Sequence, residues 1–234
     1  MSEVFEQFFD FSIMWESRHQ IWKGFRHNVD LFLIAEAIVL VWALLVAIVR
    51  LLPGRAAAPL RWVAIAYIDV FRGLPAIVVI YLIGFALPRT DLFYFSDLSI
   101  FERACFALVL VYGAYVAEVY RSGIESVHWS QTAAARSLGL SHRQTMRHVI
   151  LPQAVRRVIP PLLNDFIGLQ KDAALVSVIG LVDGLRQANL QASKFVNASP
   201  IVGLGLCFVA ITIPLARVVD YLVKRDRRRM QANV

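Results

Sequence analysis

Charged side chains lie inside several apolar stretches of this sequence, where a charge is expensive to keep and usually serves a function. In residues 158–182, Asp165 and Asp172 are seven residues apart, so they share one face of a helix. Asn164 and Lys171 repeat this spacing and form a second column beside the first. A zwitterionic small molecule needs one anionic and one cationic partner, and the two columns offer both. The alternative interpretation is a structural network between helices.

A second group of polar and turn-forming residues begins at Asp69. Asp69 and Arg72 have i,i+3 spacing and can pair on one helix face. Gly73 and Pro75 then free local backbone groups, which membrane proteins tolerate only against protein or a water-lined cavity. Arg72, Gly73 and Pro75 are therefore candidates for a hinge and pathway wall. Alternatively, a helix starts here at the membrane interface and Arg72 reaches towards the cytosol.

A third charged group, Glu118 and Arg121, follows an uncharged stretch. Its i,i+3 spacing predicts an ion pair on one helix face. We interpret this pair as a structural anchor rather than as part of a pathway.

No constellation in the sequence predicts catalysis or metal binding. There is no phosphate-binding loop and no Gly-x-Ser-x-Gly motif. Cys105 and Cys207 are far apart in apolar stretches, which favours neither a disulfide nor a zinc site. His128, His142 and His148 lack the spacing of a helical metal site. We expect a chain that is not an enzyme, with no catalytic residue, no metal and no cofactor of its own.

The central loop, residues 121–157, predicts a first short helix. Ser130 can cap a helix that runs to Leu138. Gly139 stands where a glycine ends a helix, and it is followed by the apolar Leu140 that such an ending favours.

A second short helix should follow in the same loop. Ser141 and Gln144 have the spacing of a capping box, and the helix should reach Ile150 and stop near Pro152. Residues 129–152 therefore predict a compact helical hairpin. Small side chains at 133–135 and a basic rim suit it to docking on a partner, whereas a solvated basic loop is the plain alternative.

Apolar stretches of membrane-spanning length must position these residues. Of the 234 residues, 58% are hydrophobic, against about 45–50% in soluble domains. Two clear spans are residues 31–49 and 198–216, and three weaker ones are residues 60–87, 101–120 and 158–182. The predicted fold is an all-α integral membrane protein with five transmembrane helices.

The loops between the spans predict the orientation. One alternate set carries fourteen basic residues and two acidic ones, in residues 50–61, 121–157 and 224–229. The other set carries seven basic and eight acidic residues, in residues 1–28, 88–103 and 183–199. The basic set should be cytosolic, which puts the N-terminus outside and the C-terminus inside. This pattern explains the net charge of +7 without a nucleic-acid partner.

Three regions follow from this pattern. Residues 1–28 form an extracytoplasmic segment, in which residues 3–15 are either an interfacial amphipathic helix or a disordered leader. Residues 29–222 form the transmembrane domain, and residues 223–234 form a basic cytosolic tail.

The spacing of the central loop resembles a known family. Residues 133–135, Gly139 and residues 149–152 match the E-A-A-x3-G-x9-I-x-L-P loop of ABC importer permeases, except that Ala133 replaces the usual Glu and Val149 the usual Ile. Residues 67–75, 115–124 and 164–172 are similar to stretches of the polar amino-acid subfamily, of the glutamate, glutamine or basic amino-acid type. That subfamily usually continues with Thr-Ser, where this chain has Ala173-Ala174.

The resemblance implies a type I permease subunit of an ATP-driven importer for polar amino acids in the bacterial cell membrane. The implied coupling residues are Ala133, Ala134, Ala135, Arg136, Gly139, Arg143, Val149, Leu151 and Pro152. The implied partners are a cytosolic ATPase dimer that binds ATP and Mg²⁺, a second permease chain, an extracytoplasmic binding protein and membrane lipid. Without the Glu at position 133, coupling should depend on shape and on the neighbouring arginines.

Other functions remain open at this point. One alternative is a self-sufficient secondary transporter, although that class usually shows internal repeats and more spans. A second alternative is an ABC permease for another small polar or amine substrate, such as an opine. A membrane-bound enzyme would need a catalytic constellation that the sequence lacks.

Overall fold

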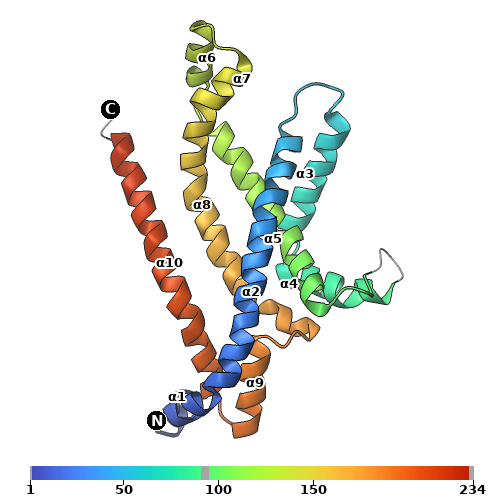
Figure 1. The fold of residues 1–234 in the computed structure, drawn as a ribbon, viewed down its shortest axis with the longest axis vertical. Coiled ribbons are helices and arrows are strands. Elements are labelled where there is room, and N and C mark those ends of the chain that lie inside the picture. Colours follow the sequence, from blue (N-terminus) through green and yellow to red (C-terminus); the bar gives the residue numbers. More distant parts are fainter. Residues whose placement is uncertain (1, 91–94, 232–234) are drawn as a thin grey trace.

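The computed structural model describes residues 2–90 and 95–231, and these ranges contain helices and turns but no strand (Figure 1). The α-helices are α1 Ser2–Phe9, α2 Phe11–Arg50, α3 Ala58–Gly73, α4 Ala76–Tyr81, α5 Ile100–Glu125, α6 Trp129–Ser137, α7 His142–Thr145, α8 Leu151–Asp172, α9 Gly184–Phe195 and α10 Ser199–Gln231. Two π-helical turns, Leu82–Ala86 and Met146–Ile150, and two 3-10 turns, Leu87–Arg89 and Leu175–Ile179, complete the description.

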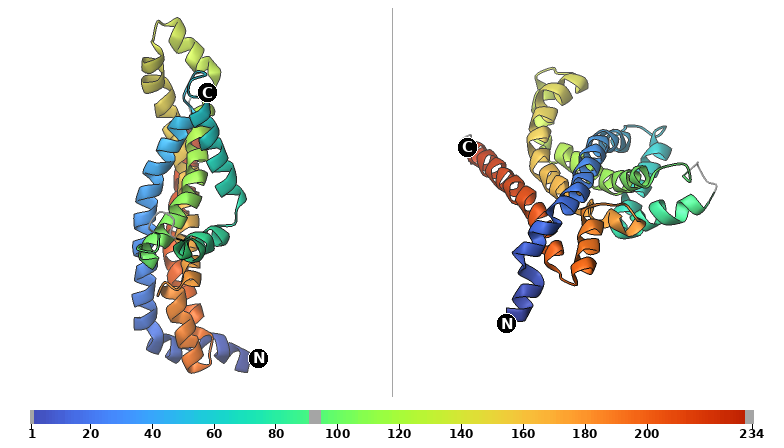
Figure 2. Two further views of the ribbon diagram at one scale, coloured as in Figure 1. Left: turned by 90° about the vertical axis from the view of Figure 1, so that its right-hand side faces the viewer. Right: turned by 60° about the horizontal axis from the view of Figure 1, so that its bottom comes forward.

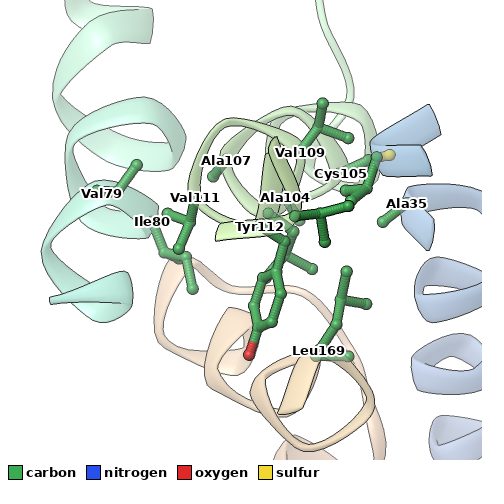
Figure 3. Close-up of a cluster of buried hydrophobic side chains, with 14 of the residues drawn as sticks. Ala35, Val79, Ile80, Ala104, Cys105, Ala107, Val109, Val111, Tyr112 and Leu169 are labelled. Carbon is green, nitrogen blue, oxygen red and sulfur yellow. The ribbon is translucent and has the colours of Figure 1, made fainter. Parts of the chain in front are cut away.

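The apolar core surrounds α5, which packs against α2, α3, α4 and α8. Figure 3 shows Leu169 of α8 and Ala35 of α2 facing this core, with Tyr112 of α5 projecting its hydroxyl towards α8. Small residues such as Ala104 and Ala107 line α5 and are fully buried, so neighbouring helices approach closely.

The N-terminal segment is helical, which rules out the alternative of a disordered leader, but it is divided into two helices, so a single helix over residues 3–15 is wrong. Asp10 interrupts the segment because its carboxylate accepts hydrogen bonds from the backbone N–H groups of Ser12 (2.9 Å) and Ile13 (3.2 Å) and caps α2. The helix α1 then lies across the end of α2 (Figure 2).

The helix α2 is far longer than its apolar run at residues 31–49. It has 40 residues, so it extends about 60 Å, twice the hydrocarbon thickness of a bilayer. Its first half is held by a buried amide, because Asn28 Nδ2 donates to the Ala173 carbonyl (2.8 Å) and to Asp183 (2.9 Å). The Asn28 Oδ1 accepts from the Gly184 N–H (2.8 Å), which fixes the start of α9 against α2.

The predicted span at residues 60–87 is broken rather than straight. The chain bends by 105° between α3 and the helical residues that follow. Leu74 is extended (φ −91°, ψ 136°), as expected of a residue before a proline, and Pro75 then caps α4.

The predicted span at residues 158–182 has different ends. The helix α8 begins at Leu151 and ends at Asp172, where Ala173 caps it, and the 3-10 turn and left-handed Gly180 follow. Pro160 and Pro161 lie inside α8 without ending it.

Within the described residues, three helical stretches are apolar and long enough to cross a membrane: Val4–Arg50, Ile100–Glu125 and Ser199–Arg225. The bent pair Ala58–Gly73 and Ala76–Arg89 makes a fourth if it is one span. The fifth predicted span, α8, carries too many charged residues to meet the same criterion. The structure therefore supports a helical membrane protein, but not the full count of five.

Candidate functional site

The helix α8 joins the two groups of residues that the sequence singled out. The hairpin of α6 and α7 lies at one end of it, and the column of Asp165 and Asp172 lies near the other (Figure 1).

The first helix of the hairpin starts two residues earlier than predicted and ends at Ser137, one residue before the predicted Leu138, with Gly139 following its cap as expected. The cap is His128, whose Nδ1 accepts from the Ser130 N–H (3.3 Å), so the assignment of Ser130 as cap is wrong. Gly139 has φ +82°, and the N–H groups of Gly139 and Leu140 donate to the carbonyls of Arg136 (3.0 Å) and Ala135 (3.1 Å). These two bonds form a Schellman motif, which needs a left-handed residue at Gly139.

The second helix begins at the predicted cap but does not stop at the proline. Ser141 and Gln144 form a reciprocal capping box. The chain then passes through one π turn, in which the Leu151 N–H donates to the Met146 carbonyl, and continues as α8. Pro152 falls in the first turn of α8, where a missing N–H and a fixed φ do little harm. The predicted stop near Pro152 is therefore wrong.

The hairpin is anchored on its inner side. Val127, Ile150 and Ala154 form a small buried cluster between the end of α5 and the start of α8. Arg157 of α8 also donates to the Ser126 carbonyl at the end of α5. The hairpin is therefore packed onto α8 and α5 rather than loosely tethered.

The outer surface of the hairpin is polar and basic with two large apolar side chains. Ala133 and Ala134 are exposed and Ala135 is buried against the turn. Trp129 (73% exposed) and Leu138 (84% exposed) project from the two ends of α6. Sequence reasoning missed both residues, although large apolar residues in a basic loop signal an interaction surface.

The other predicted docking residues surround this surface. Val149 is half-buried beneath the hairpin, and the remaining five are exposed: Arg136, Gly139, Arg143, Leu151 and Pro152.

The two polar columns of α8 have different surroundings. Asp165 and Asp172 are half-buried, and Asp172 Oδ2 accepts a hydrogen bond from the Tyr112 hydroxyl of α5 (2.9 Å). Asp165 Oδ2 is buried with no hydrogen-bond partner among the described residues. Asn164 and Lys171 are exposed. The acidic column thus faces the helix bundle and the other column faces outwards.

Glu36 of α2 belongs to the same region, although it was not among the predicted site residues. Its side chain is buried (7% exposed) and lies close enough to Asp165 for the two carboxylates to repel each other. The rings of Phe32 and Phe166 meet edge to face at 4.5 Å one helical turn away. Glu36 is the single charge in residues 31–49, and that was the signal in the sequence.

Arg72, Gly73 and Pro75 lie at the bend between α3 and α4, and all three are exposed. Among the described residues no ion pair joins Arg72 to Asp69, so the predicted pair is wrong. Its guanidinium instead lies 5.8 Å from the centre of the Tyr115 ring of α5.

Glu118 and Arg121 form an ion pair on α5, and a third partner joins them. Arg50 Nη1, at the end of α2, lies 2.6 Å from Glu118 Oε2, and Arg121 also pairs with Glu125. One carboxylate therefore ties α2 to α5.

Neither the apolar groove described next nor the placement of the His, Cys, Asp and Glu side chains points to another substrate or metal site among the described residues. A groove of about 560 Å³ between α2 and α5 is almost wholly apolar, with Ile34, Ile38 and Trp42 among its lining residues. It lies apart from the acidic column. Within the described residues no cluster of three or more His, Cys, Asp or Glu could hold a metal ion.

Comparison with known proteins places these features in context. Residues 41–228 match the family described as binding-protein-dependent transport system inner membrane component. The probable glutamine ABC transporter permease protein GlnM of Bacillus subtilis is 35% identical over 215 residues, 92% of this chain and 96% of the relative. The glutamine transport system permease protein GlnP of Escherichia coli is 34% identical over 226 residues, 95% and 98% of the two chains.

A solved structure is similar over most of its length. The crystal structure of an amino acid ABC transporter with histidines superposes with a TM-score of 0.82 at 31% identity, covering 91% of this chain and 96% of the other. An inward-facing MetNI methionine ABC transporter shares the fold, with a TM-score of 0.65 at 20% identity.

Proposed function

The chain belongs to the family of binding-protein-dependent transport system inner membrane components, and we propose that it forms the translocation pathway for polar amino acids in an ABC importer. As a member of this family it is a multi-pass permease subunit of the inner membrane and a transport component rather than an enzyme. The comparisons favour this function over a secondary transporter, because every named relative and structural neighbour above is an ABC transport protein.

The proposed membrane topology has five spans, with the N-terminus outside and the C-terminus in the cytosol. The three apolar helices, the bent pair and α8 would supply the spans. Figure 1 supports this orientation, because the end of α2, the hairpin and the end of α10 all lie towards one end of the molecule. That end carries Arg50, Arg136, Arg143, Lys224 and Arg225, as cytosolic segments do.

The proposed partners follow from the division of labour in this family. A cytosolic ATPase dimer would bind ATP and Mg²⁺ and dock on the hairpin, a second permease chain would complete the pathway, and an extracytoplasmic binding protein would deliver substrate. The observation that carries the docking proposal is the continuity of the hairpin with α8 through the π turn. A displacement of the hairpin therefore moves the helix that bears Asp165 and Asp172.

The proposed substrates are polar amino acids, since relatives are named for glutamine and for glutamate and aspartate. A zwitterion crossing the bundle meets the acidic column of α8 together with Arg72 at the α3–α4 bend, and Asn164 and Lys171 extend the set. Ala173 and Ala174 supply no hydroxyl, so another small polar or amine substrate, such as an opine, is the second candidate.

Substitution on the hairpin tests the docking. Leu138→Asp places a charge at the C-cap of α6, where the apolar side chain is 84% exposed. It should reduce co-purification of the ATPase and substrate uptake about tenfold, because apolar anchors dominate such contacts. Val196→Asp is the matched control, because Val196 is equally exposed (81%) and follows α9, at the other end of the molecule. Unchanged co-purification in Leu138→Asp and in a chain with residues 130–152 replaced would refute the docking role.

A further inference from the structure

A groove of about 380 Å³ lies where the first half of α2 meets the start of α10. Figure 1 shows these two segments side by side, close to α1. Behind the groove, Ile21, Phe25 and Leu204 are buried together, so the two helices are fixed against each other. Gly203 and Cys207 of α10 form one wall of the groove. The α2–α10 groove is therefore built into the packing of these helices.

The rim of the α2–α10 groove is basic and aromatic. Arg18, His19 and Trp22 line it and are exposed, and among the described residues no acidic side chain lines it. The Arg18 guanidinium lies 4.0 Å from the centre of the Trp15 ring, a contact that holds the cation at the rim.

Arg18 has donors to spare for a ligand. One of its five N–H groups donates to the Trp15 carbonyl. In the part of the chain that the structure describes, neither Arg18 nor His19 forms an ion pair. The remaining N–H groups of Arg18 are therefore suited to an anion at the mouth of the groove.

The groove opens onto surface that is apolar enough for the membrane interior. Residues 198–216 of α10 carry no charge, and Ile201 and Leu206 are 38% and 55% exposed. Trp15 and Trp22 are 68% and 61% exposed, and tryptophan is enriched at the boundary between membrane and water. The groove thus leads from an interfacial rim into the hydrocarbon layer.

We propose that the α2–α10 groove binds one phospholipid whose headgroup carries a net negative charge. Arg18 and His19 donate hydrogen bonds to the phosphate group, and an acyl chain lies along Ile21, Gly203 and Cys207. Basic pockets between membrane helices recognise anionic headgroups in this way. Free inorganic phosphate offers the same anion but leaves the apolar wall in contact with water, so the groove favours the lipid.

Quenching of tryptophan fluorescence by brominated lipids reports on this site, because Trp22 lines the groove. The full chain keeps Trp22 as its single tryptophan, with Trp15, Trp42, Trp62 and Trp129 replaced by phenylalanine. It is reconstituted in phosphatidylcholine vesicles that contain brominated phosphatidylglycerol or brominated phosphatidylcholine. The anionic lipid should bind about fivefold more tightly at Trp22, because an arginine attracts an anionic headgroup by about that factor. A chain that keeps Trp42 alone, within the uncharged part of α2, should show no preference.

Two variants of the Trp22 chain test the rim and the wall separately. Arg18→Gln should remove the preference for the anionic lipid, and its exposed position leaves the packing intact. Gly203→Leu should also remove it by filling the groove, because a Cβ added at Gly203 already lies 3.8 Å from Ile21 and Met14. Gly205→Leu is the matched control on the same helix. A Cβ there meets nothing within 4 Å, so the preference should remain.

Four results would overturn the proposal. The first is equal affinity of the two lipids at Trp22 in the parent chain, and the second is a preference that survives either Arg18→Gln or Gly203→Leu. The third is a Trp22 that neither brominated lipid quenches, which would show that protein covers the groove. The fourth is loss of the preference in excess inorganic phosphate, which would assign the rim to the free anion.

Discussion

Glu118 holds two arginines from different helices with one carboxylate, and both arginines are largely shielded from solvent. Glu118→Gln leaves Arg50 and Arg121 without their shared anion, so the free energy of unfolding should fall by about 2 kcal/mol. Glu125→Gln is the control, because Glu125 is 52% exposed and, among the described residues, forms an ion pair with Arg121 alone. Thermal unfolding in detergent measures both. Equal losses in the two variants would show that the link between α2 and α5 contributes nothing of its own.

Gly139 is the residue on which the shape of the hairpin depends. Gly139→Ala forces a side chain into a left-handed conformation (φ +82°) and should destabilise the hairpin by about 1–2 kcal/mol. ATPase binding should weaken, whereas Gly205→Ala, inside a helix with open space around it, should leave binding intact. An ATPase pull-down titration measures the change. Wild-type affinity in Gly139→Ala would contradict the role of the Schellman motif.

Among the acidic residues that the structure describes, Asp165 has a buried carboxylate oxygen without a hydrogen-bond partner. Asp165→Asn removes its charge beside Glu36, and we expect uptake to fall about tenfold, or about 1.4 kcal/mol, while the ATPase still co-purifies. Asp69→Asn, at an exposed position on α3, is the control. Equal uptake by the two variants would assign Asp165 a structural role.

The structural roles that could be predicted from the sequence are those that depend on residues only a few positions away. The capping box of Ser141 and Gln144 and the left-handed Gly139 follow from spacing over a few residues. Glu36 was not assigned because its neighbour Asp165 is more than a hundred residues away. His128 was missed because histidine rarely caps a helix, and the preferred Ser130 stood two positions later.

At the scale of elements, α5 and α8 pack most closely at Gly123, where an added side chain would have the least space of any glycine in the described residues. A Cβ added at Gly123 would lie 2.0 Å from Val158 Cγ2. Gly123→Ala should therefore destabilise the chain by about 2 kcal/mol through overpacking. The double variant with Val158→Ala should recover most of the loss, because it removes the clashing methyl groups. A double-mutant cycle by thermal unfolding measures this, and additive losses would contradict a direct contact.

Element boundaries were predicted less well than element existence. Each predicted apolar stretch contains helix in the structure. The observed helix ends differ from the predicted ones where two local sequence signals favour different boundaries. Pro152 was taken as a stop, yet a proline in the first turn of a helix fits as well as one after its end. Pro75 and Asp10 broke stretches that hydrophobic pattern alone joined, because backbone geometry outweighed composition at both.

At the scale of the whole molecule, the orientation is open to a direct measurement. In a chain without Cys105 and Cys207, a cysteine at Val196 should react with a membrane-impermeant maleimide on intact spheroplasts. A cysteine at Leu138 should react only after permeabilisation, because the hairpin is proposed to be cytosolic. Both positions are more than 80% exposed, so accessibility within the chain does not limit either. The reverse labelling pattern would invert the topology.

The continuity of α8 with the hairpin determines how a force applied to the hairpin is transmitted along the chain. With α7 and the π turn it forms one rod from His142 to Asp172, about 45 Å long, that resists compression along its axis. Pro160 and Pro161 remove two N–H donors midway, so the rod is more compliant in bending at that joint than elsewhere. If the hairpin is the docking site that we propose, a push along the axis should reach Asp165 with less loss than a sideways push, which the joint should partly absorb. The direction of such a push, and not only its size, should then determine how far the acidic column moves.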